Sequence, residues 1–176
     1  EVLGGGNLLV AIDSFSETDL PVEKIDAFTD TAEDLVKLNP DLVVVAFDFN
    51  GIVEGLENLE INYVLLPPAR SYEDVYFQIE EIGNLINKVD ESKNLVSSMK
   101  NDVEKIIEAF SQENIKVFHE IGFTYGIYTI NENSFIGEIY NLLGIENVAN
   151  LKEDPFGSGY PEYSEEEVIN SDPNLI

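Results

Sequence analysis

The sequence contains no cysteine, no tryptophan, a single histidine and only nine lysine and arginine residues among 176. Without cysteine, disulfide bonds and thiolate metal sites are excluded. The nine basic residues stand against 35 acidic ones, which gives a formal net charge of −26 at pH 7. Nucleic acids and anionic membranes are bound through clustered Lys and Arg, so neither is an expected partner. A solvated acidic surface is the simplest explanation of this charge, and a basic partner is the alternative.

Long apolar segments are missing too. No run approaches the 18 continuous apolar residues of a membrane-spanning helix, so no transmembrane span is predicted. A content of 44% apolar and 10% aromatic residues nevertheless indicates a globular chain. The opening "EVLGGGNLLVAID" shows no signal peptide and begins abruptly, and we expect that a preceding segment has been removed.

No catalytic motif is present. A GxSxG nucleophile and a P-loop are both absent, and the glycines at 4–6 precede a predicted strand, the wrong order for cradling a phosphate. The one histidine, His119, lies beside Glu120 in a predicted strand and is interpreted as structural. A Zn or Mn site would require several His and carboxylate ligands. We therefore predict no catalytic residue, no bound metal and no cofactor.

The first part of the chain alternates predicted strands and helices. The predicted strands are 7–13, 41–47 and 61–67, and the predicted helices are 31–38 and 51–59. The continuous apolar run 41–47 is typical of a strand covered on both faces in a parallel sheet. Thr31 is the expected N-cap of its helix, with Asp34 at the capping-box position. This order predicts an open α/β lobe.

Two helices are predicted after Pro67-Pro68. The apolar face of the first is formed by Val75, Ile79, Ile82 and Ile86, and that of the second, residues 91–112, by Leu95, Met99, Val103, Ile106 and Phe110. The second helix has about 20 residues and would be roughly 30 Å long. A helix of that length is predicted to connect two lobes.

The pattern of elements then restarts. The next expected elements are a strand over 115–122 and a helix over 134–144, with Ser134 as N-cap and Gly144 as its stop. Residues 164–176, "SEEEVINSDPNLI", repeat residues 31–43, "TAEDLVKLNPDLV", without a gap. Both copies predict a capped helix, an Asp/Asn-Pro break and the start of a strand. The repeat therefore predicts a second lobe built like the first.

Taken together, these stretches resemble the substrate-binding proteins of ABC importers for cobalamin, haem and ferric siderophores. The resemblance is carried by "LLVAIDSFS", "IDAFTDTAEDLVKLNPDLVVV", "VFHEIGFTYGIYTINENSFIGEIYNLLGIENVA" and "YPEYSEEEVINSDPNLI". It implies an α/β fold of two parallel-sheet lobes joined by one long helix, with an N-terminal lobe at 1–88, the helix at 89–113 and a C-terminal lobe at 114–176. Because members of that family continue past the second "DPNLI", we expect the second lobe to be incomplete and the chain to be a fragment.

A ligand site is expected outside the carboxyl ends of the strands, where open α/β sheets bind their ligands. The predicted ligand-binding residues are Ser14, Phe15, Phe28, Phe47, Phe49, Asn50, Tyr125 and Tyr160. Loop packing explains any one of these aromatics alone, but their recurrence favours a large, flat, partly apolar ligand. Arg70 is the one basic residue expected near the site. Because anionic chelates call for Arg or Lys clusters, a corrinoid or a neutral or cationic iron chelate is favoured.

The resemblance also implies a docking role for two glutamates. In such importers one glutamate on each lobe docks onto arginines of the permease, and the matching motif supplies Glu166, with Glu54 as a less regular match in the first lobe. A solvated carboxylate that stabilises its own helix dipole is the alternative for both.

The predicted protein is an extracytoplasmic monomer, periplasmic or lipid-anchored at the cell surface. It is expected to capture a corrinoid or iron chelate in an interlobe cleft and to deliver it to an ABC permease. An enzyme whose catalytic residues lie beyond this chain, and an acidic interaction module without a small ligand, are the two alternatives.

Overall fold

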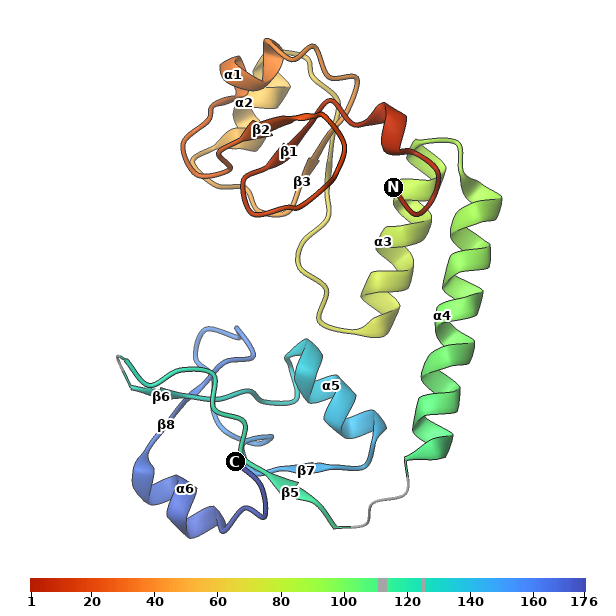
Figure 1. The fold of residues 1–176 in the computed structure, drawn as a ribbon. Helices are drawn as coiled ribbons and strands as arrows, with labels where there is room; N and C mark the ends of the chain where they lie inside the picture. Colours follow the sequence, from red (N-terminus) through yellow and green to blue (C-terminus); the bar gives the residue numbers. More distant parts are fainter. Residues whose placement is uncertain (111–113, 125) are drawn as a thin grey trace. The chain divides into compact units, whose positions relative to one another are not determined.

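The computed structural model describes residues 1–110, 114–124 and 126–176 and has a mixed α/β fold (Figure 1). Its residues group into two compact units. Unit 1 consists of Glu1–Pro68 and Glu80–Lys93, and unit 2 consists of Ala69–Ile79 and Asn94–Ile176. Small parallel sheets and one long helix confirm the predicted fold class, and each unit has its own buried residues.

Unit 1 contains two parallel strand pairs. Strand β1 (Ala11–Asp13) pairs with β2 (Glu23–Ile25), and β3 (Val43–Val45) pairs with β4 (Tyr63–Leu65). The prediction of a strand starting at residue 7 is wrong, because η1 (Gly6–Leu8) is a short 3-10 helix. The chain turns there through the preceding glycines, and the amide of Leu8 donates to the carbonyl of Gly5.

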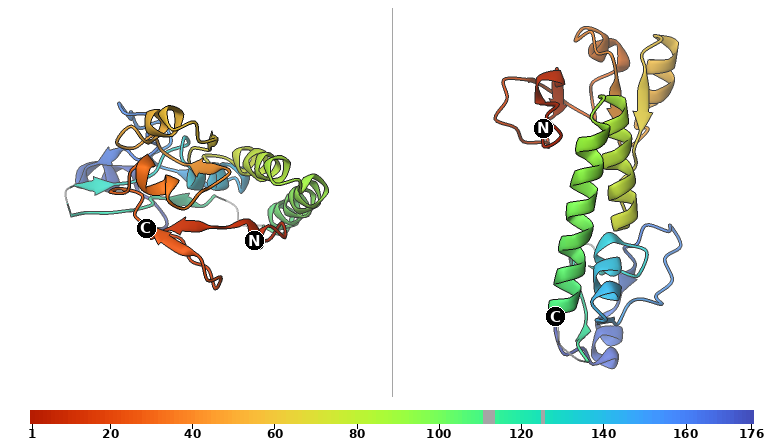
Figure 2. Two further views of the ribbon diagram at one scale, coloured as in Figure 1. Left: turned by 90° about the horizontal axis from the view of Figure 1, so that it is seen from above. Right: turned by 90° about the vertical axis from the view of Figure 1, so that its right-hand side faces the viewer.

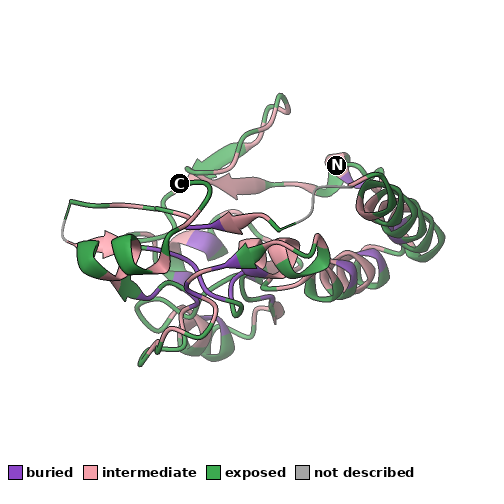
Figure 3. Cartoon of the chain, turned by 90° about the horizontal axis from the view of Figure 1, so that it is seen from below, coloured by how far each residue is buried: buried purple, intermediate pink, exposed green. Residues whose placement is uncertain are grey.

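Two short helices cover β3. They are α1 (Ala32–Val36) and α2 (Ile52–Asn58), and the core that they form with the strand consists of Ala32, Leu35, Val45 and Leu56. Gly55 permits the close approach of α2, because a Cβ atom at this position would lie 2.7 Å from the Cβ of Ala32. The expectation that β3 is covered on both faces is wrong at Val44, whose side chain is 55% exposed. The helices cover one face of the strand, and buried residues are few (Figure 3).

The helices α3 (Tyr72–Leu85) and α4 (Val89–Ala109) lie side by side (Figure 2), and each contributes residues to both units. They are joined by a tight turn in which Asn87 has a left-handed φ of 57°. Gly83 packs directly against Ser92 across the hairpin. Both helices were predicted, although the expected end of the second, at residue 112, lies outside the described residues.

The predicted apolar faces of α3 and α4 are only partly correct. Most of their members are half-buried, but Ile106 is 61% exposed. Lys100 of α4 lies over the ring of Tyr76, one turn into α3, so the last turn of α4 extends beyond the start of α3. The most deeply buried positions are Tyr76, Ser92 and Val96, which the spacing did not single out.

Unit 2 has a second small parallel sheet. Strand β5 (Lys116–Val117) pairs with β7 (Glu146–Asn147), and Val117 also forms a parallel bridge with Leu175. The strands expected over 115–122 and at the second "PNLI" are therefore much shorter than predicted. An antiparallel pair, β6 (Ile127–Tyr128) with β8 (Glu162–Tyr163), was not predicted. Phe118, Ile130 and Ala149 of this unit are almost completely buried, and the ring of Phe118 contacts that of Tyr163 in β8.

The helix starts of the sequence repeat match in detail. In α1, the carboxylate of Asp34 accepts from the amide of N-cap Thr31 at 3.1 Å. In α6 (Glu165–Ser171), the carboxylate of Glu167 accepts from the amide of N-cap Ser164 at 2.9 Å. Both are capping boxes, and each satisfies amide groups that the first turn leaves free. The predicted Ser134 cap of α5 (Phe135–Leu142) is also confirmed, since its hydroxyl accepts from Gly137.

Candidate ligand-binding site

Three phenylalanines of unit 1 form one cluster at the carboxyl ends of the strands. Phe15 follows β1, Phe28 follows β2 and Phe49 follows β3. The ring centroids of Phe15 and Phe28 lie 5.5 Å apart at an interplanar angle of 81°, and those of Phe28 and Phe49 lie 5.3 Å apart at 83°. Such edge-to-face contacts are favourable between aromatic rings. We call Phe15, Phe28 and Phe49 the phenyl cluster.

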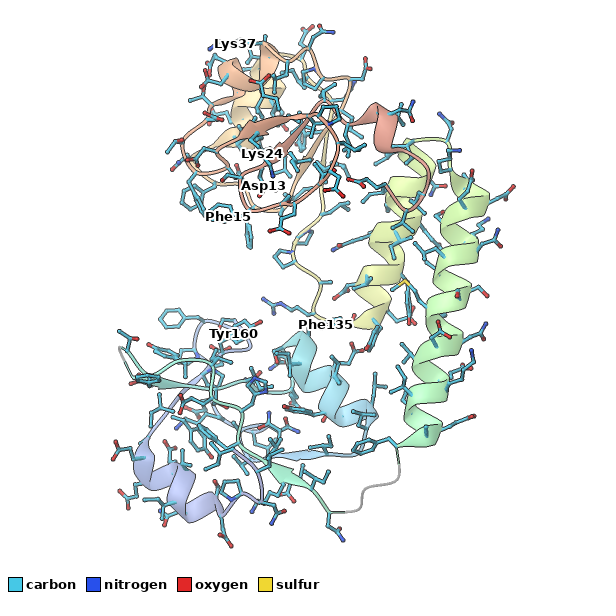
Figure 4. All side chains as sticks on the ribbon, viewed as in Figure 1. Asp13, Phe15, Lys24, Lys37, Phe135 and Tyr160 are labelled. Atoms are coloured by element: carbon cyan, nitrogen blue, oxygen red, sulfur yellow. The ribbon has the colours of Figure 1, made fainter. Side chains whose placement is uncertain are left out.

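The phenyl cluster remains open to solvent although its rings touch. The exposed fractions are 73% for Phe15, 53% for Phe28 and 48% for Phe49. Figure 4 shows Phe15 projecting from the loop after β1, away from the strand. Phe47, two residues before Phe49, is also exposed but is not part of the cluster. Sequence reasoning predicted these residues separately, and the structure brings three of them together.

An aspartate fixes the position of two of these rings. The carboxylate of Asp13 accepts from the amide of Phe15 at 2.8 Å, and that of Asp26 accepts from the amide of Phe28 at 2.9 Å. These are Asx turns, in which a carboxylate replaces a backbone acceptor. A hydrogen bond from the Ser16 hydroxyl lowers the pKa of Asp13, so this carboxylate is ionised at neutral pH.

The remaining predicted residues of unit 1 have different surroundings. The side-chain amide of Asn50 donates to the carbonyl of Phe28 at 3.0 Å and so links two of the loops that carry the phenyl cluster. Asn50 and Gly51 both have left-handed φ angles, which turn the chain into α2. Ser14 is exposed between Asp13 and Phe15.

In unit 2, Tyr125 lies outside the described residues, and Tyr160 lies on the loop after β7 (Figure 4). Its side chain is 45% exposed, and its amide donates to the hydroxyl of Ser158. Gly159, just before it, is buried with a φ of 89°, and a Cβ atom there would lie 3.0 Å from the carbonyl oxygen of Asn133. The backbone beside Tyr160 is therefore tightly constrained.

Phe156, on the same loop, was missed by sequence reasoning. It is 92% exposed, and its amide donates to the carboxylate of Asp154 at 3.2 Å. Partial burial opposes ionisation of Asp154, but hydrogen bonds from Gly159 and Ser158 outweigh it and lower the pKa. The Asp-x-Phe spacing is the one found at Phe15 and Phe28, and it is the signal that would have identified Phe156.

Unit 2 also contains an open hollow of about 720 Å³ next to β8 and α6. Its charged lining residues are Glu120, Lys152, Glu162, Glu165 and Glu167. Lys152 contacts the carboxylate of Glu167 and lies 5.3 Å from the ring centroid of Tyr163. The ammonium group of Lys152 therefore already has partners within the protein.

His119 contacts the hydroxyl of Tyr140 through Nδ1 at 2.7 Å, and burial raises the pKa of that tyrosine. This contact gives the histidine a structural partner. Within the described residues, no group of three or more His, Asp or Glu side chains is placed to hold a metal ion. Over the same part of the chain, no helix is both long and apolar enough to cross a membrane.

The two glutamates expected to dock onto a permease occupy similar local positions. Glu54 lies in the first turn of α2 and Glu166 in the first turn of α6, and both side chains are exposed. Glu166 differs from its neighbour Glu167, whose carboxylate is occupied by the capping box and by Lys152.

Comparison with known proteins identifies the family. The family model described as periplasmic binding protein matches residues 11–176. The chain belongs to this family. The match confirms the family that the sequence motifs indicated. It also confirms the predicted extracytoplasmic location. The chain is 26% identical to the uncharacterised ABC transporter substrate-binding lipoprotein YvrC of Bacillus subtilis, over 99% of the chain and 57% of that relative. It thus spans little more than half the length of this curated relative.

Solved structures show the same fold. A possible iron-binding periplasmic solute-binding protein of Staphylococcus epidermidis has a TM-score of 0.84 and 24% identity, over 98% of this chain and 69% of that one. The periplasmic haem-binding protein HutB of Vibrio cholerae has a TM-score of 0.82 and 17% identity, over 97% and 67%. The vitamin B12-binding protein BtuF of Vibrio cholerae has a TM-score of 0.74 and 20% identity, over 98% and 68%.

Proposed function

We propose that the protein is the substrate-binding component of an ABC importer and that it captures a corrinoid or an iron chelate outside the cytoplasm. The observation that carries this proposal is the phenyl cluster, in which Phe28 contacts both other rings and all three rings are open to solvent beyond the carboxyl ends of β1, β2 and β3. Open α/β sheets bind their ligands at this end. Membership of the periplasmic binding protein family supports the role.

The size of the exposed ring surface favours a large ligand. An aromatic side chain buries roughly 150–250 Å² when covered completely, and these three rings are each about half exposed or more. Covering about 200 Å² of apolar surface contributes about 5 kcal/mol before the entropic cost of association is subtracted. A corrin ring or the organic shell of an iron chelate provides enough area, whereas a bare metal ion does not.

The proposed ligand contacts are the residues that the sequence pattern indicated. They are Ser14, Phe15, Phe28, Phe47, Phe49 and Asn50 of unit 1, and Tyr125 and Tyr160 of unit 2. Asn50 has a second role in this proposal, because its amide already links two ligand-binding loops. Delivery to the permease is proposed to use Glu54 and Glu166, the exposed glutamates at the starts of α2 and α6.

Calorimetric titration of the intact protein tests the proposal. The titrants are cyanocobalamin, cobinamide, a ferric trihydroxamate, a ferric tricatecholate and haem, with apo-chelators as controls. We expect at least one corrinoid or ferric hydroxamate to bind with a dissociation constant of about 1 μM or lower, which corresponds to about −8 kcal/mol. Failure of all five to bind would contradict the proposal.

A further inference from the structure

All the charged residues in the three loops that carry the phenyl cluster are acidic. Residues 14–22, 26–31 and 46–51 contain no lysine and no arginine, and their acidic residues are Glu17, Asp19, Asp26, Asp30 and Asp48. Asp13, the last residue of β1, adds another carboxylate immediately before the first loop. The loops that carry the exposed rings therefore contribute negative charge and no positive charge.

Each ring of the phenyl cluster follows a carboxylate by one or two residues in the sequence. The Asx turns place Asp13 two residues before Phe15 and Asp26 two residues before Phe28, with the backbone amide of each phenylalanine bonded to the carboxylate. Asp48 directly precedes Phe49 and accepts from the amide of Val53 at 3.1 Å. An ionised carboxylate has about four acceptor sites, so these bonds leave its charge and further acceptor capacity in place.

Three of the four lysines of unit 1 already have hydrogen-bond or ion-pair partners within the unit. Lys24 of β2 donates to the carbonyl of Ser16, and it is a single cation beside six carboxylates. Lys37 is 2.6 Å from the carboxylate of Asp34, and Lys88 is 2.9 Å from that of Glu91. Each of these two lysines is paired with an acidic residue of its own helix or helix start.

We propose that the phenyl cluster receives a positively charged part of the ligand, either the face of a metal complex with net positive charge or a pendant ammonium group. The inference rests on the proposed function and specifies the chemistry of the same site. Ring faces attract cations through their quadrupole, and surrounding carboxylates add to this attraction. An anionic chelate, or one with free carboxylates, would meet like charge as it approached. Charge complementarity therefore selects the cationic ligand.

A charge series on one scaffold tests the inference with the intact protein. The hydroxamate series is a linear ferric trihydroxamate with a free terminal ammonium, its neutral N-acetyl derivative and its anionic N-succinyl derivative. The corrinoid pair is aquocyanocobinamide, which is cationic, and dicyanocobinamide, which is neutral. On the scaffold that binds, we expect the cationic form to bind about 10-fold more tightly than the neutral form, a factor that corresponds to one cation–π contact. The succinyl form should bind most weakly.

Salt and charge-removing variants provide the second measurement. At about 0.5 M NaCl the screening length falls to a few ångströms, so the preference for the cation should shrink. In the double variant D26N/D48N the side-chain carbonyls still accept the loop hydrogen bonds, but two charges are lost, and the preference should fall several-fold. The matched control is Glu104→Gln, an exposed acid on α4, which should leave the preference unchanged.

The possible outcomes separate the two proposals. Equal or tighter binding of the neutral or anionic form overturns the charge inference and leaves the proposed function standing. An unchanged preference in D26N/D48N also overturns it. If neither scaffold binds in any charge form, the proposed function fails and the charge inference falls with it.

Discussion

A methyl group placed on Gly83 would lie 2.3 Å from the hydroxyl oxygen of Ser92. Ser92 is 1% exposed and donates to the carbonyl of Val89 at 2.9 Å, so it has no free space to retreat into. The hairpin of α3 and α4 therefore depends on two small residues facing each other, and this contact lies inside unit 1.

We expect Gly83→Ala to lower the free energy of unfolding of the intact protein by about 2 kcal/mol, the usual cost of overpacking a tight contact. The loss should appear although alanine is favoured over glycine in a helix by about 1 kcal/mol. Urea unfolding followed by circular dichroism measures it. The matched control is Asn84→Ala, at an exposed position of the same helix, with an expected change within about 0.5 kcal/mol. Addition of Ser92→Gly should recover part of the loss, and no loss at all in Gly83→Ala would contradict the close contact.

A pH effect is expected from the second capping box. A hydrogen bond from Lys152, supported by those from Ser164, lowers the pKa of Glu167 from 4.5 to about 2. Because the folded value is the lower one, the stabilisation is fully present above pH 4.5 and is lost as the pH falls towards 2. Carboxyl-carbon NMR titration should give a much higher pKa for Glu167 in Lys152→Met. Lys105→Met, which removes an exposed helical lysine, is the control and should leave Glu167 unchanged.

Phe28 should contribute most to ligand affinity within the phenyl cluster, because it contacts both other rings. We expect Phe28→Ala to weaken binding of whichever ligand titrates by about 10-fold or more, since it removes a contact surface and leaves Phe15 and Phe49 unsupported. Phe77→Ala is the control, because Phe77 is 60% exposed on α3 and outside the cluster. Equal affinities for the two variants would show that the cluster does not bind the ligand.

Glu166 is expected to act in transport and not in ligand capture. In cells that depend on the importer, Glu166→Gln should lower uptake about 10-fold through the loss of a charge pair with the permease. Its ligand affinity, measured by calorimetry, should equal that of the unmodified protein. The adjacent Glu165→Gln is the matched control and should retain uptake. A fall in uptake of the same size in both variants would point to general loss of acidic charge instead of docking.

Local interactions are the part of the fold that the sequence predicts well. The two capping boxes, the Ser134 cap and the bounds of α2 and α5 depend on residues three or four positions apart, and all are present. Strand lengths depend on partners far away in the chain and were overestimated. The predicted burial of Val44 and Ile106 was wrong because it also depends on distant parts of the chain. Apolar spacing indicates which face of an element is apolar, but not whether another element covers that face.

The candidate site was predictable as a set of positions but not as an arrangement. Recurrence of aromatics after the strands indicated Phe15, Phe28 and Phe49 one by one. Their mutual contacts depend on how three loops meet, which no local spacing encodes. Strand ends did not indicate Phe156, which is marked instead by the aspartate two residues before it.

The Asp-x-Phe turns also affect how a ligand is captured. At Phe15, Phe28 and Phe156 the backbone amide is already bonded to the carboxylate two residues earlier. Fixing a mobile backbone residue costs about 1–2 kcal/mol of conformational entropy, and the backbone of these turns is already ordered in the folded protein. A ligand then has to order only side-chain torsions when it arrives. We therefore expect capture to be as fast as encounter permits, and discrimination among ligands to appear in how long each remains bound.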